Sequence, residues 1–106
     1  MSNLFHNLMS SKLVRDHIPE IITQSGKVVH THTATSEEYL HKLVEKLQEE
    51  CKEYSKSYDP EELADILEVV YALGEIHKIP PKNLETIRKK KKSVRGGFSK
   101  KIILEL

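Results

Sequence analysis

The sequence predicts a mainly α-helical protein, a helical bundle with a small two-stranded β element. Apolar residues recur at three- and four-residue steps over two long stretches, residues 36–57 and 60–77. A capping residue or a proline stands where each stretch begins. The 106 residues contain 38% hydrophobic side chains, so we expect one domain, residues 12–106, after a flexible N-terminal arm, residues 1–11.

The first third of the chain predicts a short helix followed by a strand. Asp16 is a suitable cap and Pro19 suits the first turn, which predicts a helix that ends near residue 25. Residues 27–35 are rich in β-branched side chains, which favours a strand of about six residues. Residues 101–106 have a similar character, so we expect a terminal strand that can pair with the first one.

The middle of the chain predicts two antiparallel helices joined by a tight turn. Ser36 is expected to cap the first helix, which runs to about Ser57, and Asp59 and Pro60 are expected to begin the second. Their apolar stripes are expected to form the core. The first stripe contains Leu40, Leu43, Val44, Leu47, Cys51 and Tyr54, and the second contains Leu63, Ile66, Leu67, Val70 and Leu73.

Charge is unevenly distributed, although the net charge is only +1. Residues 37–68 carry 11 of the 16 acidic residues, and residues 88–101 carry 8 of the 17 Lys and Arg. Much of the basic segment belongs to a further predicted helix, residues 81–94. An acidic middle and a basic end suit a metal-bound anion held from two sides, although most charge runs are the solvated faces of a charged helical protein.

Cysteine content and hydropathy indicate a cytoplasmic protein. The single cysteine, Cys51, excludes an intramolecular disulfide framework. No apolar run approaches the ~20 residues that a membrane span needs, so no membrane partner is expected. The first residues lack a basic flank followed by an apolar segment, so we expect no signal peptide.

Two acidic motifs lie on either side of the predicted turn. Glu49, Glu50 and Glu53 come near the end of the first long helix, and Glu62 and Asp65 come at the start of the second. A spacing of three residues places two side chains on one helical face, so adjacent antiparallel helices can direct four carboxylates toward one point. Clustered carboxylates repel unless a cation lies between them, and hard oxygen ligands suit Mg²⁺. The stretch therefore predicts a Mg²⁺ site that handles a polyphosphate.

Glu62 is the most informative of these acids. It falls inside the apolar arc of its helix, whereas Glu68 projects from the opposite side. Burying an unpaired charge is very costly, and a metal or a cationic partner would offset that cost. The alternative is that Glu62 is only half-buried in the first turn, where the helix dipole favours acids.

Together with two flanking segments, the acidic motifs resemble the MazG-like all-α nucleoside triphosphate pyrophosphohydrolases. The motifs read Glu-Glu-Cys-Lys-Glu at residues 49–53 and Glu-Leu-Ala-Asp at residues 62–65. Residues 12–19, Lys-Leu-Val-Arg-Asp-His-Ile-Pro, and residues 95–98, Arg-Gly-Gly-Phe, are similar to the phosphoribosyl-ATP pyrophosphohydrolase-like branch. The turn between the two motifs is shorter than in many members of the family.

The resemblance implies a helical bundle that assembles as a dimer or tetramer. It also implies hydrolysis between the α- and β-phosphates of a nucleoside triphosphate, with Mg²⁺ as cofactor and Mn²⁺ as a substitute. The implied metal ligands are Glu50, Glu53, Glu62 and Asp65. Glu49 or Glu53 could orient or deprotonate the attacking water, and opposing cations could bind phosphate. The candidate phosphate-binding residues are Lys12, Arg15, Lys91 and Arg95.

Other functions stay open. One alternative within the enzymes is a true phosphoribosyl-ATP pyrophosphohydrolase of histidine biosynthesis. Another class is a nucleic-acid or partner-binding module that uses the basic segment 88–101. No aromatic residue interleaves with the basic run and the rest of the surface is acidic, so nucleic acid is the less favoured partner. A third alternative is an inactive bundle used for assembly.

Overall fold

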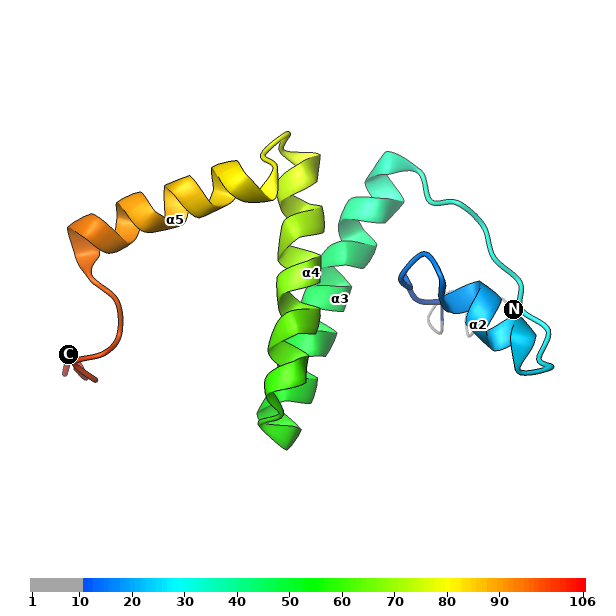
Figure 1. Ribbon diagram of the computed structural model, residues 1–106, viewed down its shortest axis with the longest axis horizontal. Helices are drawn as coiled ribbons and strands as arrows, with labels where there is room; N and C mark the ends of the chain where they lie inside the picture. Colours follow the sequence, from blue (N-terminus) through cyan, green and yellow to red (C-terminus); the bar gives the residue numbers. More distant parts are fainter. Residues whose placement is uncertain (1–10) are drawn as a thin grey trace. The chain divides into compact units, whose positions relative to one another are not determined.

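The computed structural model describes residues 11–106, and every regular element in that range is an α-helix (Figure 1). The prediction of a mainly α protein is therefore confirmed. The predicted arm, residues 1–11, lies outside the described residues except for its last position. The chain divides into two compact units, one ending at Val70 and the other beginning at Tyr71. The helices are α2 (Ile18–Gln24), α3 (Ser36–Ser57), α4 (Pro60–Ile76) and α5 (Pro81–Arg95).

The short helix α2 begins slightly later than predicted. Its N-cap is His17 rather than Asp16, and no side chain caps it. Pro19 lies in the first turn as expected, where its missing N–H costs least. After the helix ends, Gly26 adopts a φ of 95°, a conformation that glycine takes without steric cost.

The predicted two-stranded β element is wrong, because no residue from 11 to 106 belongs to a strand. β-branched residues favour an extended backbone, but a strand is stable only when a neighbouring strand completes its hydrogen bonds. Residues 27–35 belong to the first unit and residues 101–106 to the second. Both segments are irregular.

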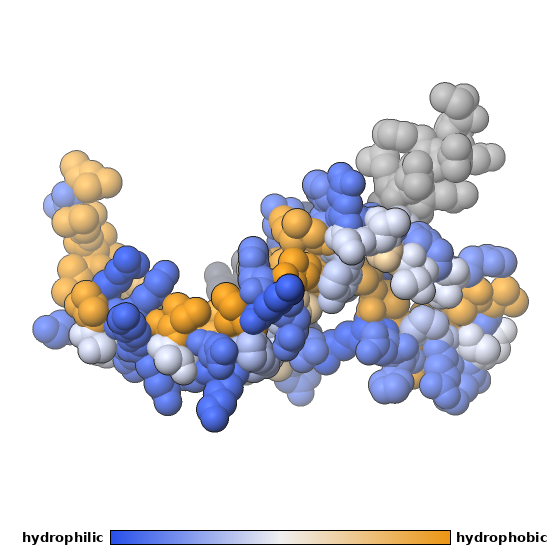
Figure 2. Space-filling view, turned by 90° about the horizontal axis from the view of Figure 1, so that it is seen from above, coloured by the Kyte–Doolittle hydropathy of each residue, from blue (hydrophilic) through white to orange (hydrophobic). Residues whose placement is uncertain are grey.

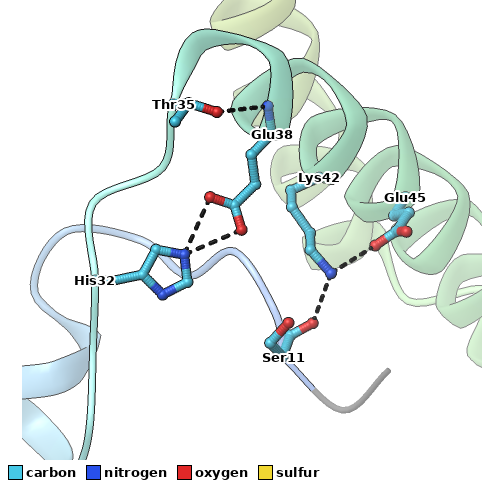
Figure 3. A network of polar contacts seen from close by, with 6 residues as sticks. All are labelled: Ser11, His32, Thr35, Glu38, Lys42 and Glu45. Carbon is cyan, nitrogen blue, oxygen red and sulfur yellow. Dashed lines mark hydrogen bonds and ion pairs between the residues drawn. The ribbon is translucent and has the colours of Figure 1, made fainter. Parts of the chain in front are cut away.

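Side chains connect the loop of residues 27–35 to the start of α3 (Figure 3). Thr35, not the expected Ser36, is the N-cap, and its hydroxyl accepts a hydrogen bond from the Glu38 N–H at 3.2 Å. The Glu38 carboxylate reaches back to His32 Nε2 at 3.0 Å. One turn later, Lys42 donates to the Ser11 carbonyl at 3.0 Å, which ties the first described residue to the same helix.

Helices α3 and α4 form an antiparallel hairpin (Figure 1). Tyr58 ends α3 in the left-handed conformation, with a φ of 54°. Asp59 then caps α4 as predicted, because its carboxylate accepts a hydrogen bond from the Glu61 N–H at 3.0 Å. This two-residue connection brings the last turns of α3 beside the first turns of α4.

The core of the hairpin is smaller than the apolar stripes predict. Leu43 and Val69 are the buried apolar side chains among the described residues, at 3% and 7% exposure. Four side chains expected in the core, Leu40, Val44, Leu63 and Leu67, are instead 40–49% exposed. Cys51, also expected in the stripe, is exposed as well. The hairpin therefore leaves part of each apolar stripe in contact with solvent.

The second unit contains the end of α4 from Tyr71 onward, all of α5 and the C-terminal tail. Gly74 is buried beside the connection between these helices, and its carbonyl accepts a hydrogen bond from the Ile79 N–H at 2.9 Å. Gly96 ends α5 with a φ of 83°. Beyond it the apolar side chains of the tail are exposed to solvent (Figure 2). Ile103, for example, is 84% exposed.

None of the helices within residues 11–106 is both long and apolar enough to cross a membrane.

Candidate metal centre

Three carboxylates meet where the end of α3 lies beside the start of α4. Glu50 comes from α3, and Glu62 and Asp65 come from one face of α4. One carboxylate oxygen from each of the three lies within 4.8 Å of the others. The short hairpin turn places the two acidic motifs at the same level, and the three-residue spacing aligns the two acids of α4. Three of the four predicted metal ligands are thus brought together.

Glu53, the fourth predicted ligand, is not a member of this three-carboxylate group. Its side chain is exposed, although its negative charge is near enough to act on Glu62. Its two predicted roles, as metal ligand and as catalytic carboxylate, stay predictions.

Glu62 experiences the electrostatic cost of the cluster. Its side chain is half-buried, and its pKa is raised above the ordinary value of 4.5. Burial is the largest cause, followed by the negative charges of Asp65 and Glu50. A cation placed among the three oxygens would offset this repulsion. The oxygen-only donor set fits a hard divalent ion such as Mg²⁺.

Arg15 contacts the cluster from the segment that precedes α2. Its Nη2 atom donates to Asp65 Oδ1 at 2.8 Å, a contact between residues 50 positions apart in the chain. Both side chains remain accessible, at 56% and 44% exposure. The structure therefore brings a predicted phosphate-binding residue directly to the carboxylates.

Glu49, predicted as a catalytic candidate, lies between two ammonium groups. Lys12 Nζ is 3.3 Å from one of its oxygens, and Lys46 Nζ is 3.7 Å from the other. Lys46 also lies 3.6 Å from an oxygen of Glu50, whose side chain is 13% exposed. The sequence reasoning missed Lys46, although its spacing of three and four residues from these acids is the signal of such helical pairs.

The remaining predicted phosphate-binding residues, Lys91 and Arg95, belong to the second unit. There they line a hollow together with Phe98, which sequence reasoning did not select. Their predicted contact with substrate phosphate stays a prediction.

Comparisons with known proteins found no match for the chain among family models, curated proteins or solved structures. The resemblance to the MazG-like pyrophosphohydrolases therefore rests on the motifs of the sequence. The geometry adds an acidic, half-buried centre with an arginine and two lysines beside it. Such a centre can bind a divalent cation and the phosphates that accompany it.

Proposed function

We propose that this protein is a Mg²⁺-dependent nucleotide pyrophosphohydrolase. It would cleave a nucleoside triphosphate between the α- and β-phosphates and release the monophosphate and pyrophosphate, in a nucleotide-pool role in the cytoplasm. The observation that carries the proposal is the convergence of Glu50, Glu62 and Asp65, with one oxygen of each within 4.8 Å of the others. These are the residues that the acidic motifs single out.

Each group at the centre has a role in the proposed reaction. Glu50, Glu62 and Asp65 would hold the cation, with Glu53 completing the set. A bound Mg²⁺ would neutralise phosphate charge and lower the pKa of a coordinated water. Glu49 or Glu53 would accept a proton from the attacking water.

The cations beside the centre would hold the substrate. Arg15 can grip a phosphate through two parallel hydrogen bonds, which a lysine cannot, and Lys12 would add a point charge. Lys91 and Arg95 are the further phosphate ligands that the sequence predicts. Because Arg15 already donates to Asp65 at 2.8 Å, its reach to the centre does not depend on a large movement.

The exposed parts of the apolar stripes support assembly as a homodimer or a tetramer. Leu40, Val44, Leu63 and Leu67 are each 40–49% exposed on the α3–α4 hairpin. Covering them with a second copy would remove apolar area from water. Because each side chain is already more than half covered, covering the rest contributes about 0.6–1.5 kcal/mol per residue, a little under half of the ~1.5–3 kcal/mol for burying a fully exposed side chain. Light scattering coupled to size-exclusion chromatography should give at least twice the mass of one chain, and a monomer at micromolar concentration would contradict this part of the proposal.

The experiment that tests the function measures pyrophosphate release from a panel of nucleotides with and without Mg²⁺. The panel contains the common NTPs and dNTPs, damaged dNTPs and phosphoribosyl-ATP, so it also separates the histidine-biosynthetic substrate from the others. We expect metal-dependent release from at least one member. Silence across the whole panel, from protein shown to be helical by circular dichroism, would refute the proposal.

A matched pair of variants on α4 ties the activity to the centre. Glu62→Gln keeps the size of the side chain but removes its charge from the centre, so we expect turnover to be lost while the fold persists. Glu68→Gln makes the same chemical change at an exposed position outside the three-carboxylate group, and we expect wild-type activity. Equal activity of the two variants would show that these carboxylates do not form the active site.

A further inference from the structure

The second unit is strongly basic and contains a hollow at the end of α5. Residues 71–106 carry 10 Lys and Arg against 3 Glu, a net charge of +7. The hollow has a volume of ≈ 580 Å³. Its lining includes Arg88, Lys91, Lys92, Arg95, Gly97 and Phe98.

Most of the positive charge at the hollow is not neutralised within the described chain. Arg88 is held by Glu85 on its own helix, with Arg88 Nε 2.9 Å from a Glu85 carboxylate oxygen. Lys91, Lys92 and Arg95 form no ion pair with any carboxylate from residue 11 to residue 106. Three like charges on one short stretch repel, and an anion in the hollow would relieve that repulsion.

The arrangement of these groups is extended rather than point-like. Lys91 and Arg95 are four residues apart on the helix, so their backbones are about 6 Å apart along its axis. The turn at Gly96 then brings Phe98 to the same hollow, where the residue is 97% exposed. A row of cations with an open aromatic ring beside it is the combination that binds single strands, because cations follow the phosphates and the ring stacks on a base.

We propose that this hollow binds single-stranded nucleic acid, with Lys91, Lys92 and Arg95 on the phosphate backbone and Phe98 stacked on a base. One of the two sequence arguments against nucleic acid, beside the acidic character of the rest of the surface, was the lack of an aromatic residue within the basic run. The structure answers it, because Phe98 follows the run in sequence but lines the same hollow. No Val, Leu, Ile or Met lines the hollow, and the exposed aliphatic residues 102–104 are not part of it, which favours a nucleic acid over a lipid surface.

The proposal does not use the carboxylates of the metal centre, although Lys91 and Arg95 are also candidate phosphate ligands of the proposed enzyme. It is tested by fluorescence anisotropy with the full chain and a labelled oligothymidylate of about 12 nucleotides, within the usual range of single-strand site sizes. EDTA is present throughout, so no metal-dependent hydrolysis can occur. We expect saturable binding at low salt, with log K falling against log salt at a slope of about −2, because each of three neutralised phosphates contributes about −0.7 on a single strand.

Two variants separate the phosphate and base contacts. Lys91→Gln combined with Arg95→Gln should reduce the slope to about −0.7 and weaken binding at every salt concentration. Phe98→Leu should weaken binding at least about fivefold while leaving the slope unchanged, because stacking does not release counterions. A change of slope with Phe98→Leu, or no loss of affinity, would contradict the base contact.

The matched control is Lys89→Gln combined with Lys90→Gln, which removes the same charge from the same helix outside the hollow. It should change the slope by less than half as much as the Lys91 and Arg95 pair. An equal change would mean diffuse electrostatic attraction and would overturn the site. No binding at about 50 mM salt would overturn it as well.

Competitors test the class of ligand. Unlabelled oligothymidylate should displace the probe, whereas thymidine monophosphate at the same phosphate concentration should not. Equal displacement by the mononucleotide would show a site for one nucleotide and would refute strand binding. Sedimentation with phosphatidylserine vesicles should show no binding that depends on Phe98, and the opposite result would assign the hollow to a lipid surface.

Discussion

Replacing Arg15 with glutamine should separate the structural role of this side chain from its role at the carboxylates. In the structure its guanidinium donates to Asp65 at 2.8 Å, and the two side chains are 56% and 44% exposed. Ion pairs this accessible to solvent contribute about 0–1 kcal/mol. The free energy of unfolding should therefore fall by no more than about 1 kcal/mol in Arg15→Gln.

The same variant should bind a divalent metal more tightly in the absence of nucleotide. Arg15 and a metal ion both neutralise Asp65, so metal binding must displace or weaken the 2.8 Å contact. Removing Arg15 removes that competition, and a contribution of up to about 1 kcal/mol corresponds to an affinity gain of up to about fivefold. With nucleotide present the effect should reverse, because the phosphates lose a bidentate partner and KM should rise.

The assay is a titration with Mn²⁺ followed by electron paramagnetic resonance or calorimetry, on wild type, Arg15→Gln and Arg15→Lys. Arg15→Lys keeps the positive charge and should retain near-wild-type Mn²⁺ affinity while still raising KM, because lysine cannot form the bidentate contact. Weaker Mn²⁺ binding by Arg15→Gln would refute the competition. A loss of more than about 2 kcal/mol in the free energy of unfolding would show that the pair is structural rather than a surface contact.

Three further predictions concern the core, the second unit and pH. Leu43→Ala should lower the free energy of unfolding by about 2–5 kcal/mol, and Val44→Ala, at a site 42% exposed, by well under half of that. Urea unfolding followed by circular dichroism measures both losses, and a larger loss in Val44→Ala than in Leu43→Ala would contradict the prediction. Gly74→Ala should lower the melting temperature, because the new Cβ would lie 2.9 Å from the Ile79 carbonyl oxygen. This clash should outweigh the helix propensity of alanine, which favours it over glycine by about 1 kcal/mol. A higher melting temperature would show that the backbone at Ile79 moves away from the new methyl group at little cost. The raised pKa of Glu62 means that its carboxyl group binds a proton more tightly in the folded protein than in the unfolded chain. The metal-free protein should therefore gain stability from this group as pH falls through its raised folded pKa toward 4.5, and lose that contribution as pH rises. The urea midpoint should therefore depend on pH with a different slope in wild type and in Glu62→Gln across this window. Parallel plots of urea midpoint against pH for the two proteins would contradict the assignment.

Local sequence signals predicted the helices well and their caps less well. Helix α3 ends at Ser57, α5 ends just before Gly96, and Asp59 caps α4, as the sequence predicts. Each of these boundaries depends on turn-forming residues that lie within a few positions of it. The cap of α3 is Thr35 rather than its neighbour Ser36, and both carry a hydroxyl. Which of the two accepts the hydrogen bond depends on how the preceding loop enters the helix, and contacts such as His32 with Glu38 help to hold that loop.

Apolar periodicity identified the faces of the helices but not the depth of burial. The same pattern contains Leu43, at 3% exposure, and Leu63, at 49%. A stripe shows which side of a helix prefers to leave water, whereas the position of the neighbouring helix decides which members of the stripe are covered. The prediction of two strands was wrong because it too depended on a neighbouring element. A β-branched composition favours an extended backbone but does not supply the partner strand that a β-ladder requires.

The local features of this protein follow from short stretches of sequence: the helices, the turn between α3 and α4, and the spacing that aligns Glu62 with Asp65. These features depend on residues a few positions apart, so periodicity and capping contain the necessary information. By contrast, the contact of Glu50 with the two acids of α4, and that of Arg15 with Asp65 across 50 positions of the chain, are set by the packing of the fold. Such contacts depend on how the packed segments lie in space, and packing is a property of the whole folded unit rather than of any short stretch.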